Sequence, residues 1–228
     1  MTDLSIVIPV YNNESTLQRL TDVIHDHLQH STYSFEILFV NDGSSDQSNK
    51  LLNRIALEKS FVRHIALEKN QGQHKAILHG FNHATGMYIV VMDADLQDDP
   101  AMIRTMCTAI DSERQAVFVL RQGAYQSFGR MITSRGLKLL IQFITGLHHK
   151  AGTYFVFHRT LLNDLFTLKC RYPYVTIMVA CCAEKIRYVK SKRGNSQGSS
   201  YTFRKRCQVA YRALVCSVDC TINRPRGR

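Results

Sequence analysis

The first 120 residues alternate short apolar runs with segments whose apolar residues recur at helical spacing. The apolar runs lie at Leu4–Val10, Phe35–Val40, Phe61–Leu67, Met87–Met92 and Ala116–Leu120. Each run is short and rich in β-branched or aromatic residues, so each predicts a strand. Strands that are apolar on both faces and separated by helices are typical of a parallel sheet buried between helices. The predicted fold class is therefore α/β, with a doubly wound, largely parallel sheet flanked by helices.

Segments with helical periodicity lie between and after these runs. They predict helices over Ser15–Leu28, Ser48–Lys59, Gln73–Ala84, Pro100–Ser112, Phe128–Ile144, Leu161–Leu168, Tyr174–Cys182 and Tyr201–Ser217. A polar stretch rich in Gly and Ser, Lys192–Ser200, precedes the last of them. We expect one domain over residues 1–190, with halves 1–120 and 121–190, followed by a flexible loop and a basic amphipathic helix over 191–228.

The apolar stretches are short. The longest uncharged ones, Leu139–Leu147 and Tyr172–Ala183, fall below the roughly 18–20 residues that cross a bilayer. The N-terminus contains Asp3 and no basic segment, so it does not resemble a secretory signal. We therefore expect a cytoplasmic protein.

The positive charge is confined to the C-terminal part of the chain. The formal net charge is +11, and the stretch Lys185–Arg228 holds twelve cations and one anion, Asp219, which accounts for all of it. A neutral body with a basic tail predicts a negatively charged partner for that tail, such as membrane head groups, nucleic acid or a phosphorylated ligand.

Seven cysteines raise the question of disulfides or a metal site. Their number is odd, no C-x-x-C occurs, and Cys181 and Cys182 lie within an apolar run. We interpret the cysteines as structural free thiols.

Polar residues follow three of the predicted strands, at Tyr11–Glu14, Asn41–Asp46 and Asp93–Asp99. Ligands of open α/β sheets bind beyond the carboxyl ends of the strands. Clustered carboxylates are unfavourable without a cation or hydrogen-bond donors, and Asp93 and Asp95 offer the hard oxygens that suit Mg²⁺ or Mn²⁺. Helix capping is the alternative for each loop alone, notably at Asp46 and before Pro100. Three such loops at one sheet edge favour a ligand site.

The phosphate-binding motifs of two large enzyme classes are absent. The first loop has no G-x-G-x-x-G, and no G-x-x-x-x-G-K-[ST] occurs in the chain, which disfavours dinucleotide oxidoreductases and P-loop NTPases. A metal ion would then neutralise the negative charge of the phosphates. That arrangement suits a nucleotide-diphosphate sugar, whose leaving diphosphate needs neutralisation.

An ordered set of motifs carries a family resemblance: SIVIPVYNNE, NDGSSDQS, Asn70-x-Gly72 and MDADLQDDP. Over residues 4–214 the chain resembles family 2 inverting glycosyltransferases of GT-A fold, above all the dolichyl-phosphate and undecaprenyl-phosphate sugar synthases. The resemblance implies two groups of donor-site residues. Those lining the nucleobase and ribose pocket are Pro9, Tyr11, Glu14 and Asp42. Those holding the ribose and a divalent ion are Asp93, Asp95 and Gln97.

A second, cationic group follows the fifth predicted strand. Arg130 and Ser134 are four residues apart, so on a helix they share a face, and Arg121 precedes them. A guanidinium with a hydroxyl suits a phosphate monoester. GRMITSRG resembles the R-x-x-x-S-R-G element that binds the acceptor phosphate in polyprenyl-phosphate glycosyltransferases; solvated helix cations are the alternative. The expected catalytic residues are Asp95, Arg121, Arg130 and Ser134.

Acidic residues are scarce in the second half. After Glu113 they are Asp164, Glu184 and Asp219. A sugar hydroxyl needs a general base, whereas a lipid phosphate, with a second pKa near 6, is already ionised. We therefore expect a polyprenyl phosphate as acceptor. A saccharide hydroxyl in capsule or lipopolysaccharide assembly is the alternative.

The C-terminal segment resembles the loop and juxtamembrane helix of these synthases. Apolar residues including Phe203, Tyr211 and Leu214 recur at helical spacing beside cations, which suits an interfacial helix on an anionic membrane surface. The implied location is peripheral, at the inner face of the membrane. A core-packed helix is the alternative, and a membrane-protein partner or a homo-oligomer stays open. We do not expect a nucleic-acid partner, because the acidic loops would repel it. A catalytically silent scaffold that binds a membrane partner is a further alternative to the enzyme.

Overall fold

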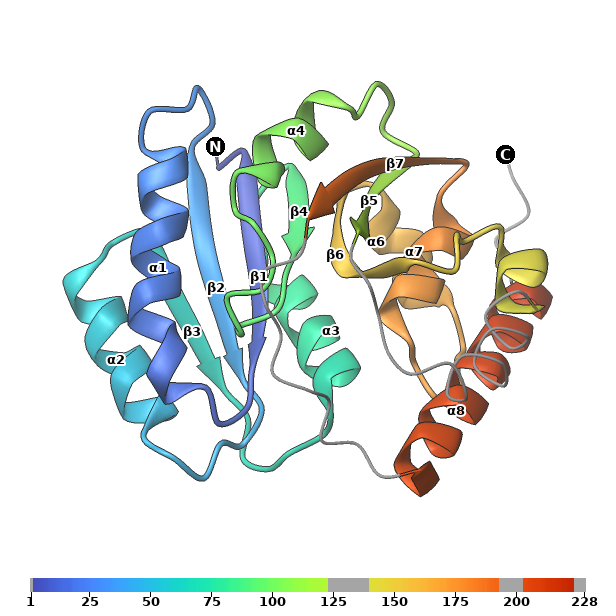
Figure 1. Ribbon diagram of the computed structural model, residues 1–228, viewed down its shortest axis with the longest axis horizontal. Helices are drawn as coiled ribbons and strands as arrows, with labels where there is room; N and C mark the ends of the chain where they lie inside the picture. Colours follow the sequence, from blue (N-terminus) through green and yellow to red (C-terminus); the bar gives the residue numbers. More distant parts are fainter. Residues whose placement is uncertain (1, 123–139, 193–202, 224–228) are drawn as a thin grey trace.

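The sheet has seven strands, with helices against both of its faces (Figure 1). The structure, a computed structural model, describes residues 2–122, 140–192 and 203–223. The strand order is β3-β2-β1-β4-β6-β5-β7. The strands are β1 (Leu4–Val10), β2 (Phe35–Asn41), β3 (Val62–Ala66), β4 (Tyr88–Val91), β5 (Gln115–Gln122), β6 (Ala151–His158) and β7 (Lys185–Lys192). The prediction of a doubly wound, largely parallel α/β sheet is confirmed.

Only β6 among these strands runs antiparallel to its neighbours, β4 and β5. Its pairing with β4 sets Phe155 opposite Val91, the last residue of β4. The first residues of β6, including Thr153, therefore extend past the end of β4. They reach the edge where the polar loops lie.

Two layers of helices enclose the sheet. One face carries α1 (Glu14–Leu28), α2 (Ser48–Glu58) and α4 (Met102–Thr108). The other face carries α3 (Gln73–His83), α6 (Leu161–Thr167), α7 (Val175–Cys182) and α8 (Phe203–Ile222). Residues 140–145 are also helical, and the rest of the helix predicted up to Ile144 lies outside the described residues.

Helix periodicity explains the packing of α1. Leu17, Leu20, Ile24 and Leu28 are buried and form one stripe against the sheet. By contrast, α7 is buried along its whole length, and every one of its residues lies in the core. A helix with apolar residues on every side needs neighbours all around, and α3, α6, β6 and α8 provide them.

The C-terminal helix α8 packs against α7 through one face. Ala213, Cys216 and Cys220 of that face are buried in the core, whereas Tyr211 and Ile222 are exposed. Within the described ranges, none of the helices combines the length and the apolarity needed to cross a membrane.

Candidate active site

The loops after β1 and β2 form one hydrogen-bonded unit. The Asn12 N–H donates to Ser44 Oγ at 3.0 Å, and the Ser45 N–H donates to Asn12 Oδ1 at 2.8 Å. The carboxylate of Glu14 accepts a 2.7 Å hydrogen bond from the Gln47 N–H. These contacts explain how two loops about thirty residues apart in sequence share one edge of the sheet.

Asp46 links the same two loops and lies just before α2. Its carboxylate accepts from the Ser48 N–H at 3.0 Å and from the Glu14 N–H at 3.2 Å. Burial opposes ionisation of Asp46, but the hydrogen bonds from Ser48 and Glu14 outweigh it and lower the pKa. The capping role considered for Asp46 agrees with the Ser48 contact.

Asp42 is buried beneath these loops and holds the segment that leads into α3. Its two carboxylate oxygens accept from the Gln71 N–H at 2.7 Å and the Gly72 N–H at 2.8 Å. Next to it, Gly43 has φ +63°, and a Cβ there would lie 2.6 Å from the backbone nitrogen of Asn70. The close approach of the two backbones at this point requires glycine.

Asp93 is held from two sides. Gln73, the first residue of α3, donates from Nε2 to its Oδ1 at 2.7 Å, and the Thr153 hydroxyl lies 2.9 Å from both carboxylate oxygens. Because Gly72 and Gln73 are consecutive, Asp42 and Asp93 contact neighbouring residues of one segment. All three predicted loops therefore meet at this edge.

Asp95 and Gln97 belong to a tight turn after β4. The Gln97 N–H donates to Asp95 Oδ1 at 3.1 Å, and Leu96 between them has φ +60°, a conformation that is uncommon for a non-glycine residue. Thr16 of α1 fixes the turn by donating from its hydroxyl to the Ala94 carbonyl at 2.7 Å. Backbone conformations of this kind cluster at active sites and ligand-binding segments.

The donor atoms at this turn fit a divalent ion. Gln97 Oε1 is a buried oxygen with no hydrogen-bond partner, and burial without a partner is costly. With the carboxylates of Asp93 and Asp95 it gives a set of hard oxygen ligands, which Mg²⁺ and Mn²⁺ prefer. We therefore regard the three predicted metal ligands as chemically suited to the ion.

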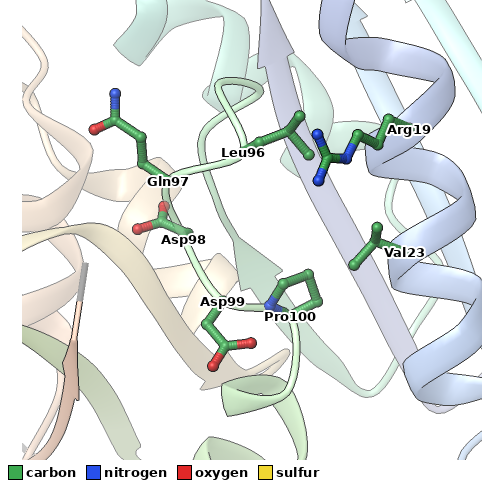
Figure 2. A pocket seen from close by; sticks show the side chains of 7 residues that line it. All are labelled: Arg19, Val23, Leu96, Gln97, Asp98, Asp99 and Pro100. Atoms are coloured by element: carbon green, nitrogen blue, oxygen red, sulfur yellow. The ribbon is translucent and has the colours of Figure 1, made fainter. Parts of the chain in front are cut away.

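A pocket of about 330 Å³ lies between the turn and α1, and its lining from the turn is Leu96, Gln97, Asp98, Asp99 and Pro100 (Figure 2). Leu96 and Pro100 point toward Arg19 and Val23 of α1, whereas Gln97 and Asp98 point to the opposite side. Asp93 and Asp95 are not among the lining residues. Gln97 is the predicted metal ligand that also lines this pocket. We therefore place the candidate site at the carboxylates of Asp93 and Asp95 and not in this pocket.

His74 is a residue of this region that the sequence did not single out. Its Nδ1 accepts from the N–H of Val175, the first residue of α7, at 3.3 Å, and its ring lies 4.0 Å from that of Tyr174. Burial lowers the pKa of His74 to about 4, although the nearby Asp93 opposes this shift. A neutral His74 thus joins the start of α3 to the start of α7.

The remaining predicted residues are placed as follows. Pro9 is buried near the end of β1, Tyr11 is 49% exposed in the loop after it, and Glu14 begins α1. Arg121 lies at the end of β5, paired in register with Ser191 of β7. Arg130 and Ser134 lie outside the described residues, so the structure does not bear on their side chains.

Most of the chain matches a known protein family. Residues 5–166 match the family described as glycosyl transferase family 2. The chain belongs to that family. It is therefore a glycosyltransferase, as its motifs predict.

Similar family 2 proteins include lipid-linked sugar transferases. The undecaprenyl-phosphate 4-deoxy-4-formamido-L-arabinose transferase of Salmonella choleraesuis (strain SC-B67) is 30% identical over 220 residues, covering 93% of this chain and 67% of the relative. The protein of the same name from Enterobacter sp. (strain 638) is 31% identical over 223 residues, with the same coverage. The chain thus spans about two thirds of the length of these relatives.

Solved structures confirm the GT-A fold. Glucosyl-3-phosphoglycerate synthase from Mycobacterium tuberculosis, in complex with uridine diphosphate, superposes with a TM-score of 0.71 at 16% identity, covering 96% of this chain and 80% of the other. S. aureus TarS 1–349, in complex with UDP-GlcNAc, superposes with a TM-score of 0.61 at 18% identity, covering 94% of this chain and 65% of the other. At these identities the likeness is one of fold.

Proposed function

We propose that this family 2 enzyme transfers a sugar, with inversion, from a UDP- or GDP-sugar to a polyprenyl phosphate. The observation that carries the proposal is the joining of Asp42 and Asp93 through the segment 71–73, which gathers three polar loops at the carboxyl edge of the sheet. The relatives named as undecaprenyl-phosphate sugar transferases support the acceptor. The neighbours solved with UDP and with Mn²⁺ support the donor.

In this proposal Pro9, Tyr11, Glu14 and Asp42 surround the nucleoside. Exposed Tyr11 offers a ring for stacking, while buried Asp42 shapes the pocket by fixing the backbone at Gly72. Because Asp42 already accepts two backbone hydrogen bonds, we assign it a positioning role for the 71–73 segment.

A divalent ion, Mg²⁺ or Mn²⁺, would be held by Asp93, Asp95 and Gln97, and would neutralise the leaving diphosphate. The protein's own contribution is orientation. Gln73 and Thr153 fix the Asp93 carboxylate from two directions, and the turn at Leu96 fixes Asp95. Oriented ligands lower the reorganisation needed as charge develops on the leaving group.

The acceptor half rests on Arg121, Arg130 and Ser134. Two guanidinium groups and a hydroxyl would clamp the phosphate monoester and aim one of its oxygens at the anomeric carbon. That oxygen is already anionic at neutral pH, so the reaction needs no general base. The scarcity of carboxylates after Glu113 supports this acceptor.

The basic tail and α8 are assigned to the membrane surface, at its inner face. Apolar side chains remain exposed on the helix, notably Val209, Tyr211 and Ile222, beside the exposed Arg212. Exposed apolar groups next to cations favour an interfacial position on anionic lipid, with about 1 kcal/mol for each cation near the surface. At low salt the chain should sediment with anionic vesicles and stay in the supernatant with neutral vesicles. Equal amounts of protein in the two vesicle pellets would contradict this assignment.

The transfer assay tests the central proposal. Purified chain, Mn²⁺ and labelled UDP- and GDP-sugars are incubated with either a polyprenyl phosphate in detergent or a free oligosaccharide. We expect label in the lipid fraction only. Arg130→Ala and Ser134→Ala should abolish transfer and leave nucleotide affinity unchanged, whereas Arg54→Ala, on the exposed side of α2, should change neither. Transfer to the oligosaccharide, or full activity of both variants, would overturn the acceptor assignment.

A further inference from the structure

Three cysteines that are distant in sequence converge where α8 meets the body of the protein. Cys216 and Cys220 are four residues apart on α8, and Cys170 precedes α7. The Cys170 and Cys220 sulfurs are 3.3 Å apart, the Cys216 and Cys220 sulfurs are 3.8 Å apart, and all three lie within 4.8 Å of one another. The interpretation of the cysteines as structural free thiols does not account for this convergence.

We propose that Cys170, Cys216 and Cys220 form a binding site for a thiophilic metal ion, with Zn²⁺ as the first candidate. In a tetrahedral zinc–thiolate site the Zn–S distance of about 2.3 Å places the sulfurs about 3.8 Å apart. The observed separations lie close to this value. A pairwise disulfide would leave the third thiol of the group unused, whereas a metal ion engages all three.

The surroundings hold the three sulfurs in place. The Arg171 N–H donates to Asp219 Oδ2 at 2.9 Å, and Asn223 Nδ2 donates to the Lys169 carbonyl at 3.4 Å. These contacts tie the backbone on both sides of Cys170 to α8. The site is therefore already assembled in the folded chain, as a structural metal site requires.

The burial of the three cysteines fits metal binding. Cys216 and Cys220 are fully buried, while Cys170 is partly exposed and offers a path for the ion. All three residues are free cysteines, so each sulfur can bond to the ion.

Metal binding would displace the protons of the thiols. Each thiol gives its proton to solvent as its sulfur bonds to the ion, so three protons are released and the three-thiolate zinc centre has a net charge of −1. The fourth position falls to water. If Cys181, which contacts Cys220 from α7, took that position as a thiolate, a fourth proton would be released and the net charge would be −2. The exposed cations Lys169 and Arg171 flank Cys170 and favour this negative charge. The ion would join α8 to the segment before α7.

The test uses the full chain, purified with reductant, stripped with chelator and kept in Mg²⁺ so that oxygen-rich sites are filled. Titration with Co²⁺ should give one equivalent bound, with a thiolate-to-cobalt charge-transfer band that Zn²⁺ displaces. Cys170→Ser and Cys216→Ser should each weaken Co²⁺ binding by more than the roughly 10–100-fold that loss of an outer-shell partner costs. Cys107→Ala, on α4 in the separate core cluster, should leave it unchanged.

Alkylation gives a second measurement that needs no variant. Zn²⁺ should protect Cys170 of the wild-type chain from a maleimide, as read by peptide mass spectrometry. Absence of the charge-transfer band, equal alkylation with and without Zn²⁺, or a Cys170–Cys220 disulfide in the chain as purified would each overturn the proposal. None of these readouts depends on donor binding or transfer, so the outcome is independent of the proposed function.

Discussion

The carboxylate of Asp42 accepts a 2.8 Å hydrogen bond from the backbone N–H of Gly72, the residue before the start of α3. The next residue, Gln73, donates to Asp93 at 2.7 Å. A buried acid at the end of β2 and an acid after β4 are therefore linked through one short segment. Together with the hydrogen bonds of Asn12 to Ser44 and Ser45, this link makes three separate loops a single site.

Asp42→Asn should weaken both the fold and donor binding. One oxygen becomes an amide NH₂, which then faces a backbone N–H of Gln71 or Gly72. Leaving a buried donor unsatisfied costs about 1–3 kcal/mol of unfolding free energy. Denaturant unfolding and calorimetry with UDP and Mn²⁺ measure the two effects. Asp26→Asn, on the exposed side of α1, should change neither, and a fully stable Asp42→Asn chain would contradict the role given to Asp42.

Thr153→Val should reduce affinity for the metal–nucleotide complex. Valine has the shape of threonine but cannot donate to Asp93, so one of the contacts that orient this carboxylate is lost. Gln73 still holds the other side, and we expect a loss of roughly tenfold. Thr108→Val, at the end of α4, removes a hydroxyl hydrogen bond to the Thr105 carbonyl and should have no effect. An unaltered affinity for Thr153→Val would remove Thr153 from the site.

His74 should make stability depend on pH between about 6.5 and 4. Its pKa is about 4 in the folded chain and 6.5 in the unfolded chain, because burial disfavours the charged ring. The unfolded state binds the extra proton over this range, so stability falls as the pH is lowered, by roughly 3 kcal/mol at most.

His74→Asn tests this dependence, because its side-chain oxygen can still accept from the Val175 N–H but does not titrate. Urea unfolding at several pH values should show a shallower loss of stability for the variant than for the wild type. Parallel curves for the two proteins would show that His74 is not buried in its neutral form.

Gly43→Ala should destabilise the fold more than Gly146→Ala. Both glycines have positive φ, +63° and +73°, so the conformational cost of alanine, about 1–3 kcal/mol, is shared. Only at Gly43 would the new Cβ meet a backbone, 2.6 Å from the Asn70 nitrogen; at Gly146 nothing lies within 4 Å. Thermal unfolding measures the difference. Equal shifts in Tm would mean that the loops after β2 and β3 do not approach closely.

The sequence predicts the first half of the fold well, since its strands are apolar on both faces and its helices are amphipathic. It does not reveal β6 and β7. The edge strand β7 reads KIRYVKSK, where cations alternate with apolar residues and mask the strand signal. β6 follows a polar stretch, and its antiparallel insertion between β4 and β5 depends on tertiary pairing.

The candidate site is likewise only partly readable. Acidic residues directly after an apolar strand are visible in the sequence, so Asp42, Asp93 and Asp95 could be predicted as candidate site residues. Thr153 is brought to Asp93 from 60 residues away by the direction of β6, and no local pattern marks it. The three converging cysteines have no sequence signature for the same reason, because their meeting depends on how α8 packs on α7.

The most direct measurement is isothermal titration of UDP and GDP into the full chain, with and without Mn²⁺. We predict that one of the two nucleotides binds, that binding requires the ion, and that Asp95→Asn weakens it roughly tenfold or more because a charged oxygen ligand is lost. Asp26→Asn serves as the control with the same change of charge. Binding that is indifferent to Mn²⁺ and to Asp95→Asn, or no binding of either nucleotide, would contradict a metal-dependent donor site at this edge of the sheet.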